Sequence, residues 1–432
     1  MLLATVVTLN CATNPEVPGL DLRPVVPQEI DAPQSATQSG SETTVTEPAQ
    51  PATTEAADEP ATSTSASEPT QPTAPAATAS ISEPDDPIEA RIDDLLAAMT
   101  LEQKVGQRFM TWIPGTAGSE RATALIDQAH VGGVIITEHN VESHDQVREL
   151  IDGLQRMAQD GPSSVPLFIA TDQEGGRVTR LRLPELTLFP AALHQGKHGD
   201  SDYVEAAAYV TGVELRRLGV NMNLAPLLDL YDRDDGTVID GRAYGDDSRL
   251  IADYARAYVR GANRAGIISV AKHFPGHGVT AYDSHDRLPV VRLTRSERAA
   301  ILAPFIAAID TGIDSVMAAH ILYEDLDPNL PASVSPAIVT GLLREQLGFD
   351  GVVITDAIEI RAPAPALMEP YLVRNSFDAG VDVILAARSS DVLPLIEEGV
   401  RLVRAGMESE ERLDESVRRI LRVKLQAMTM ER

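Results

Sequence analysis

The sequence contains a single cysteine, Cys11, among 432 residues, so the chain cannot close an internal disulfide. It also lacks an apolar run of about 18 residues, the length that a membrane-spanning helix requires, so no transmembrane helix is expected. Basic residues are scarce as well: 36 Lys and Arg stand against 64 Asp and Glu, for a formal net charge of -28. Nucleic acids and anionic lipids bind to basic surfaces, so this charge argues against either as a partner.

The chain begins with a short apolar segment, residues 1–9, which Asn10 and Cys11 follow. An apolar start that ends in a cysteine resembles a bacterial lipoprotein signal, and it predicts a signal segment over residues 1–11 with a membrane tether at Cys11. The protein would then lie in the cell envelope or outside the cell. No Lys or Arg precedes the apolar run, which an upstream start codon would explain; an incidental cysteine is the alternative.

Residues 12–87 consist mainly of Thr, Pro, Ala, Ser and Glu, with thirteen acidic residues and one basic residue, Arg23. Their apolar content is low and has no period, so burial cannot offset the loss of chain entropy, and we predict a disordered linker. Segments rich in Ser, Thr and Pro are typical of extended stalks. The linker would hold residues 88–432 away from a surface.

Residues 88–432 alternate short apolar runs with amphipathic segments. Eight runs are predicted to be strands: 107–112, 133–137, 166–171, 220–224, 267–271, 315–319, 351–355 and 381–385. Helices are predicted over 88–99, 202–218, 250–265, 297–309, 336–347 and 410–428, and Thr100 and Gln103 form a capping-box pattern. Eight strand–helix units predict a single (β/α)8 barrel of the TIM type, in the α/β class. A doubly wound open sheet is the alternative, but no Gly-x-Gly-x-x-Gly follows a predicted strand.

Titratable residues gather where the fifth predicted strand ends. That strand leads into the sequence KHFPGHG at 272–278, and DSH follows at 283–285. Pro275 and the glycines prevent a long helix, so the histidines are predicted to lie on a loop. Barrel enzymes place their chemistry on the loops at the carboxyl ends of their strands. Structural histidines and a metal site are the alternatives, although no helix can present His273 and His277 on one face.

Further polar residues follow other predicted strands at the same end. Asp172 follows the third strand, Asp229 the fourth, His320 the sixth and Asp356 the seventh. A carboxylate directly after a buried strand, as Asp356 is, is held rigidly at the mouth of a barrel, and a helix cap is the alternative. For Asp229 a capping role and a functional role are equally open. His320 could line the pocket or be structural.

The sequence KHFPGHG followed by DSH resembles glycoside hydrolase family 3, and within it the β-N-acetylglucosaminidases. DQEGGRV at 172–178 and RAYG at 242–245 resemble further motifs of the family, and the similarity spans most of residues 91–428. The resemblance implies that Asp356 is the nucleophile, that His285 is the acid/base and that Asp283 orients His285. It also implies that no metal or organic cofactor is needed. The implied substrate-binding residues are Asp172, Arg180, Arg242, Lys272 and His273.

We therefore expect a retaining exo-glycosidase, a monomer, that hydrolyses terminal β-linked N-acetylglucosamine of carbohydrate substrates such as peptidoglycan fragments. An unperturbed histidine titrates near pH ~6.5, so both protonation states of His285 are accessible. The alternatives are a β-glucosidase, a β-N-acetylglucosaminide phosphorylase and a non-catalytic sugar-binding barrel. The family's glucosidases generally take their acid from a second domain, and none is expected after the predicted helix at 410–428.

Overall fold

The computed structural model describes residues 86–231, 239–279, 288–359, 365–368, 371–387 and 391–429, which all belong to one compact unit. The predicted signal segment, nearly all of the predicted linker, and Asp283 and His285 lie outside the described residues. None of the described helices is long and apolar enough to cross a membrane.

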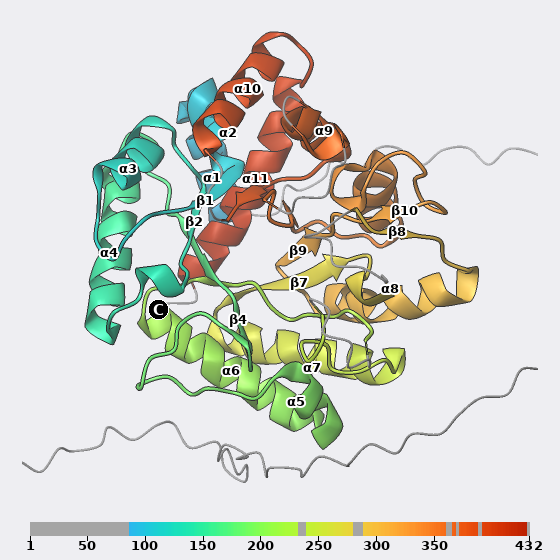
Figure 1. Ribbon diagram of the computed structural model, residues 1–432. Helices are drawn as coiled ribbons and strands as arrows, with labels where there is room; N and C mark the ends of the chain where they lie inside the picture. Colours follow the sequence, from blue (N-terminus) through green and yellow to red (C-terminus); the bar gives the residue numbers. More distant parts are fainter. Residues whose placement is uncertain are drawn as a thin grey trace, which may run out of the picture. The chain divides into compact units, whose positions relative to one another are not determined.

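Eight parallel strands form one sheet in the order β11-β9-β7-β6-β3-β2-β1-β12. The two ends of this order meet, because Ile354 in β11 forms a parallel bridge with Val383 beside β12, and the Thr355 N–H donates to the Val383 carbonyl at 2.9 Å. The sheet therefore closes into a barrel, as Figure 1 shows, with the helices arranged around the strands. The strands are β1 (Phe109–Trp112), β2 (Gly133–Ile135), β3 (Phe168–Thr171), β6 (Met222–Asn223), β7 (Ile268–Phe274), β9 (Ser315–Ala318), β11 (Val352–Thr355) and β12 (Ile384–Ala386).

Within the described residues, two small pairs of strands lie outside the barrel sheet. They are the antiparallel pair β4 (Gln173–Gly175) and β5 (Val178–Thr179), and the parallel pair β8 (Val290–Val291) and β10 (Leu322–Tyr323). The α-helices are α1 (Pro87–Ala98), α2 (Leu101–Gln107), α3 (Glu120–Thr123), α4 (His144–Asp160), α5 (Ala192–His198), α6 (Ser201–Arg217), α7 (Ser248–Ala265), α8 (Arg295–Asp310), α9 (Tyr371–Ala379), α10 (Val392–Arg404) and α11 (Glu410–Thr429). Shorter or non-α turns are η1 (Ala124–Gln128), η2 (Glu138–Asn140), η3 (His277–Val279), η4 (Ala332–Val334), η5 (Ala337–Gln346) and η6 (Pro365–Leu367).

The sequence predicted this architecture closely. All eight strands and the predicted helices are present, and the segment predicted as a helix over 336–347 is the π-helix η5. The capping box is confirmed, because Thr100 Oγ1 accepts from the Gln103 N–H and Gln103 Oε1 accepts from the Thr100 N–H.

One prediction is wrong in detail: β7 does not end at residue 271 but continues to Phe274, so His273 lies in the strand and not on a loop. The extension is held by backbone hydrogen bonds, since the Lys272 N–H donates to the Pro226 carbonyl at 3.0 Å and the Phe274 carbonyl accepts from the Ala319 N–H at 2.8 Å. His277, in contrast, lies beyond the strand as expected.

The interior of the barrel is apolar and is closed at one end by α11. Side chains of the strands, such as Met110, Phe168 and Met222, form a buried cluster with Ile420 and Val423 of α11. Helix α11 packs where the strands begin, because Lys424 donates a hydrogen bond to Gln107, just before β1. We call this amino-terminal end of the strands the floor and the opposite, carboxyl-terminal end the mouth.

Candidate active site at the mouth of the barrel

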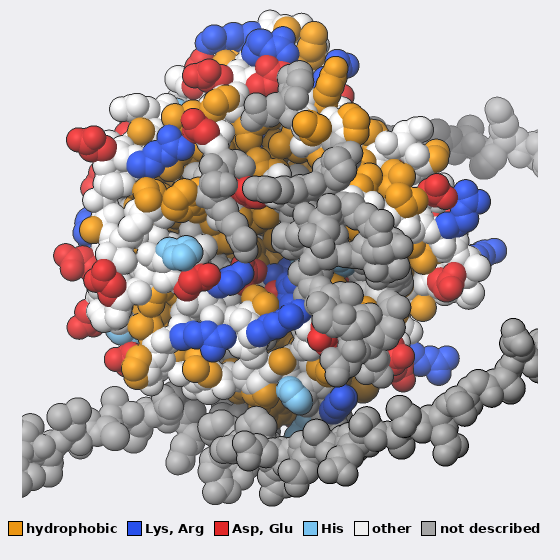
Figure 2. Space-filling view, in the orientation of Figure 1, with side chains coloured by type: hydrophobic (Ala, Val, Ile, Leu, Met, Phe, Trp, Pro, Cys, Tyr) orange, Lys and Arg blue, Asp and Glu red, His pale blue; other side chains and the backbone are white. Residues whose placement is uncertain are grey.

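The polar residues singled out in the sequence converge at the mouth. Asp172 follows β3, Asp229 follows β6, Lys272 and His273 lie near the end of β7, and Asp356 follows β11. Because the strands are parallel, their carboxyl ends meet at the same end of the barrel. Figure 2 shows Lys, Arg, Asp and Glu side chains gathered near the centre of the displayed face.

Lys272 lies at the centre of a buried cluster of charges. Its Nζ is 2.8 Å from Asp172 Oδ1 and 2.6 Å from Glu174 Oε1. Arg242 donates from Nη2 to Glu174 Oε1 at 2.7 Å and from Nε to Glu174 Oε2 at 2.9 Å, a bidentate pair. The cluster brings three predicted site residues together, and Arg180 Nε lies 3.8 Å from Asp172 Oδ2 at its edge.

Glu174 is the residue of this cluster that the sequence analysis missed. Burial would raise the pKa of its carboxyl, but Arg242 and Lys272 outweigh burial and hold the pKa far below its usual range. Burial alone would lower the pKa of Lys272, but the attraction of Asp172 and Glu174 outweighs burial, so the pKa of Lys272 is raised. The signal was present in the sequence, since Asp172 and Glu174 are two residues apart and so point to the same side of an extended chain.

The turn between β4 and β5 returns the chain to the mouth. Gly175 and Gly176 both have positive φ angles, of 101° and 58°, and a Cβ on Gly176 would lie 2.5 Å from the Ala191 side chain. A residue with a side chain would be strained there, so glycine is required at this turn. After the turn, the Arg180 N–H donates to the Asp172 carbonyl at 3.1 Å, which places the two side chains side by side.

Asp229 anchors the segment that carries the two histidines. Its Oδ1 accepts from the backbone N–H groups of His273, at 3.2 Å, and His277, at 2.5 Å, and its Oδ2 lies 2.8 Å from His273 Nδ1. A carboxylate only accepts, so His273 donates from Nδ1. Burial would raise the pKa of Asp229, but His273 and the other partners outweigh it and the pKa is lowered. Asp229 therefore caps this segment and orients His273.

Asp356 is a half-buried carboxylate directly after β11. Its Oδ1 accepts from the Ala357 N–H at 2.7 Å. Burial would raise the pKa of Asp356, but the electrostatic influence of His273 and His320, together with the Ala357 hydrogen bond, outweighs burial and lowers the pKa. The carboxylate is therefore ionised at neutral pH and has the charge that a nucleophile needs.

His320 is buried after β9, and its Nδ1 lies 2.6 Å from Ser333 Oγ. Burial lowers the pKa of His320, and this effect outweighs the opposing influence of Asp356. Asp356 and His320 thus each influence the pKa of the other, while the hydrogen bond between His320 and Ser333 belongs to the surrounding structure.

A cavity of about 380 Å³ opens beside Asp172 and Arg180. This volume lies within the range of small-ligand pockets, about 300 to 1,000 Å³. The cavity lies at the ends of β1, β2, β3 and β12 and is lined by Trp112, Ile135, Thr137, Glu138, His139, Asp172, Arg180 and Ala387.

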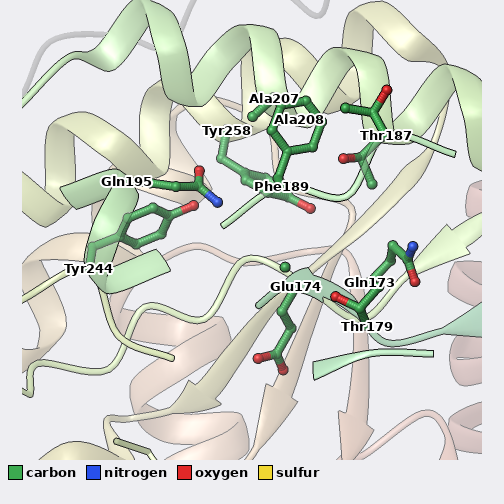
Figure 3. Close-up of a pocket in the computed structure, with 12 residues that line it drawn as sticks. Gln173, Glu174, Thr179, Thr187, Phe189, Gln195, Ala207, Ala208, Tyr244 and Tyr258 are labelled. Carbon is green, nitrogen blue, oxygen red and sulfur yellow. The ribbon is translucent and has the colours of Figure 1, made fainter. Parts of the chain in front are cut away.

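A second cavity, drawn in Figure 3, lies behind Glu174 and has a volume of only about 20 Å³. It has room for about one water molecule, so it is no substrate site. In Figure 3 the Glu174 side chain runs away from Phe189 and Tyr258. The Asn223 side chain links Tyr258 to the strand that carries Glu174. Its Nδ2 donates to the Tyr258 hydroxyl at 3.0 Å, and its Oδ1 accepts from the Gln173 N–H. These contacts fix the backbone on which Glu174 is carried.

The predicted acid/base pair, Asp283 and His285, lies outside the described residues, so its geometry stays a prediction. Across the part of the chain that is described, no group of three or more His, Cys, Asp and Glu residues is arranged to hold a metal ion.

Barrels of this kind carry their active sites at the carboxyl ends of the strands, and the fold and the charged mouth together define an enzyme of the (β/α)8-barrel class. The family model of the glycosyl hydrolase family 3 N-terminal domain matches residues 100–423. The chain belongs to glycoside hydrolase family 3, which confirms the resemblance seen in its sequence.

Three relatives illustrate the match. Beta-hexosaminidase A of Pseudoalteromonas piscicida is 34% identical over 324 residues, which are 69% of this chain and 54% of that protein. The structure of a family 3 β-N-acetylglucosaminidase from Paenibacillus sp. str. FPU-7 has 40% identity and a TM-score of 0.74, covering 78% of this chain and 64% of the other. The β-N-acetylhexosaminidase from Beutenbergia cavernae has 32% identity and a TM-score of 0.70, covering 76% and 98%. This chain thus spans less than two thirds of the first two relatives.

Proposed function

We propose that the protein is a retaining exo-glycosidase that releases terminal β-linked N-acetylglucosamine. The observation that carries this proposal is the ionised Asp356 carboxylate after β11, at the same mouth as the Lys272 cluster. The names of the Paenibacillus and Beutenbergia relatives support the N-acetylated substrate.

In the first step, an Asp356 carboxylate oxygen attacks the anomeric carbon of the sugar and the bond to the leaving oxygen breaks. His285, as an imidazolium, gives its proton to that oxygen. In the second step, neutral His285 takes a proton from water while the water oxygen attacks the anomeric carbon and Asp356 leaves as a carboxylate. Asp283 would orient His285 and stabilise the imidazolium. Two displacements retain the anomeric configuration.

The sugar would be held by Asp172, Arg180, Lys272 and His273 through its hydroxyl groups. Lys272 and Asp172 already form a fixed donor and acceptor pair, and charged hydrogen-bonding groups of this kind are stronger than neutral ones. Arg242 was predicted to contact the sugar as well, and its bidentate pair with Glu174 suggests a second role, which is to hold Glu174 and, through it, Lys272.

We propose that the protein releases this sugar from N-acetylglucosamine-terminated glycans of the cell envelope, such as peptidoglycan fragments. The signal-like segment at residues 1–11 and the stalk-like composition of 12–87 support an envelope or extracellular location with a lipid tether at Cys11. We propose that the protein acts there as a monomer.

The proposal is tested by initial rates of the purified full chain on matched chromogenic β-N-acetylglucosaminide and β-glucoside, each with and without a chelator. A strong preference for the N-acetylated substrate that the chelator does not affect is expected. Preference for the glucoside would make the protein a β-glucosidase instead. Loss of turnover with the chelator would replace the proposed mechanism with a metal-dependent one.

A further inference from the structure

Two carboxylates contact Lys272, and they differ in how far the fold has already engaged them. Glu174 is the more enclosed: its side chain is 5% exposed, and its two oxygens accept from Lys272 at 2.6 Å and from Arg242 at 2.7 and 2.9 Å. Asp172 is 18% exposed and lines the cavity of about 380 Å³, which Glu174 does not line. A sugar hydroxyl that enters the mouth therefore reaches Asp172 more readily than Glu174.

The ammonium of Lys272 is itself enclosed, since only 3% of its side chain is exposed. An ammonium has three donors, and Asp172 and Glu174 use two of them, which leaves a third for a sugar hydroxyl. A hydroxyl that binds at Asp172 competes with Lys272 for that carboxylate. Burying a charge without a full partner is costly, so Lys272 needs a carboxylate that the sugar does not engage. Glu174 is the partner that Lys272 can keep.

Arg242 and the backbone of β4 prevent Glu174 from following the substrate. The guanidinium of Arg242 spans both Glu174 oxygens, a geometry that fixes the plane of the carboxylate. Next to Glu174, the Gln173 N–H donates to Asn223 Oδ1 at 3.0 Å, and Gln173 Nε2 donates to the Leu181 carbonyl at 3.0 Å. The fold therefore holds Glu174 both at its carboxylate and at the neighbouring backbone.

We propose that Glu174 is a positioning residue of the active site, which keeps Lys272 charged and in place as a donor while the sugar engages Asp172. The inference rests on the proposed function, which assigns Asp172 and Lys272 to the sugar.

The charged groups that face Lys272 come from three parts of the chain: Asp172 after β3, Glu174 in β4 and Arg242 before α7. The two carboxylates raise the pKa of Lys272, whereas burial and Arg242 lower it. Removing the charge of Glu174 must therefore lower the pKa of Lys272. The ammonium would then lose its proton at a lower pH, and it would be held by Asp172 alone, the carboxylate that the sugar engages.

The charge of Lys272 can be measured directly, because the chain has only four lysines, Lys104, Lys197, Lys272 and Lys424. The full chain is labelled with lysine that carries ¹³C at Cε, whose NMR shift differs between ammonium and amine, and single Lys→Arg variants assign the signals. Because the wild-type pKa of Lys272 is raised above 10.5, its signal should remain that of an ammonium up to about pH 10. In Glu174→Gln the pKa of Lys272 should lie at least about one pH unit lower than in the wild type.

Glu138→Gln is the matched control, because it removes a carboxylate of the same mouth whose partner is Arg180, at 3.4 Å, and not Lys272. It should change the pKa of Lys272 by less than about half as much as Glu174→Gln does. Glu174→Asp keeps the charge but draws the carboxylate back by one methylene group, so it should lower the pKa of Lys272 by a smaller amount. Circular dichroism checks folding, and Glu174→Asp decides the question if Glu174→Gln does not fold.

Turnover tests whether Glu174 acts through Lys272. The value of kcat/KM for a chromogenic β-N-acetylglucosaminide should fall about tenfold in Glu174→Gln at neutral pH. In a Lys272→Met background the same substitution should cost less than about threefold, because the ammonium that Glu174 positions is already absent. A residue that only supported the fold would lower the activity of both backgrounds by the same factor.

The NMR titration needs no substrate, so this inference and the proposed function can fail separately. Wild-type turnover of the β-N-acetylglucosaminide, together with a lowered pKa of Lys272 in Glu174→Gln and the smaller loss in the Lys272→Met background, supports the inference. An unchanged pKa of Lys272 in Glu174→Gln, or an equal loss of activity in both backgrounds, overturns the inference and leaves the proposed function in place. Absence of wild-type turnover overturns the proposed function, and the pKa of Lys272 in Glu174→Gln then decides alone whether Glu174 holds the charge of Lys272.

Discussion

The mouth and the floor of the barrel each contain a buried lysine, and the pKa values of the two lysines are shifted in opposite directions. Lys272 at the mouth and Lys424 at the floor are both 2% exposed. Two carboxylates raise the pKa of Lys272 above its ordinary value. Lys424 has Gln107 at 2.7 Å and the ring of Phe168 at 4.9 Å, and burial lowers its pKa far below its ordinary value. Burial alone therefore does not set the charge of a lysine; its partners do.

The same contrast holds for the carboxylates. At the floor, Asp382 accepts from Arg344 at 2.6 Å, Arg419 at 3.0 Å, Ser416 at 2.9 Å and the Val353 N–H at 2.8 Å. These partners belong to η5, β11 and α11, so the Asp382 carboxylate links the three elements. At the mouth, Asp172 and Arg180 border a cavity large enough for a ligand. Charged groups are therefore enclosed by the fold at the floor, whereas at the mouth they border a cavity of ligand size.

The largest expected effect is at the mouth. Asp356→Ala removes the proposed nucleophile, so turnover should fall by more than about a thousandfold, with little change in the free energy of unfolding. With an activated substrate, added azide should restore turnover and give a glycosyl azide of inverted configuration, because the small anion takes the place of the carboxylate. More than about a thousandth of the activity without azide would rule out Asp356 as the nucleophile.

Asp382→Ala is the counterpart at the floor and should act on stability. It leaves the partly buried Arg344 and Arg419 without their fully buried carboxylate, and loss of one partner of a buried ion pair typically costs about 3 to 5 kcal/mol. Urea unfolding measures this loss, and the folded fraction should retain its turnover rate. Asp350→Ala, at an exposed carboxylate near the same end, should change stability by less than about 0.5 kcal/mol. A large loss of turnover in folded Asp382→Ala would break the distinction between floor and mouth.

Lys272→Met tests whether the ammonium at the mouth is used by the substrate. The methionine keeps the length of the side chain but leaves Asp172 and Glu174 without that cation, and kcat/KM should fall by about a hundredfold. Steady-state kinetics, with circular dichroism as the check on folding, measure the effect. Lys272→Arg keeps the charge and should recover part of the loss. Equal activity of the wild type and Lys272→Met would make this cluster as structural as that of the floor.

The fold could be predicted from the sequence because strands buried on both faces read as continuous apolar runs. The position of the mouth followed from the same pattern, since Asp172, Lys272 and Asp356 each come at the carboxyl end of a strand. The extension of β7 could not be predicted, because Lys272 and His273 are polar and gain their strand conformation from neighbouring backbone groups.

The charge networks could not be predicted from the sequence, because the residues that form them are distant from one another in the chain. Glu174 precedes two glycines, and its role depends on Arg242, in a turn between β6 and α7, and on Lys272, in β7. At the floor, Arg108 and Asp382 look like ordinary charges before a strand. Only the packing of Glu408, Ser416 and Arg419 at the end of the chain shows that they are buried and paired.

The smallest effect is expected at Lys424. Its folded pKa is lowered, so between that pKa and the ordinary value of 10.5 the unfolded chain binds a proton that the folded chain does not. The wild type must therefore gain stability as the pH rises in this window, and Lys424→Met lacks this gain. From pH 8 to pH 10 the stability of Lys424→Met relative to the wild type should fall by about 1 to 3 kcal/mol.

Urea unfolding of both proteins at the two pH values measures the difference, and other titrating groups cancel because they are common to both. Lys104→Met is a suitable control, because Lys104 is paired with Asp414 at 2.6 Å on a more exposed part of the same end. A pH-independent difference for Lys424→Met would mean that this lysine stays charged in the folded protein. Lys424 would then be a buried ammonium that has no carboxylate partner among the contacts described. Lys272 and Lys424 would both be charged, and they would differ only in the groups that surround them.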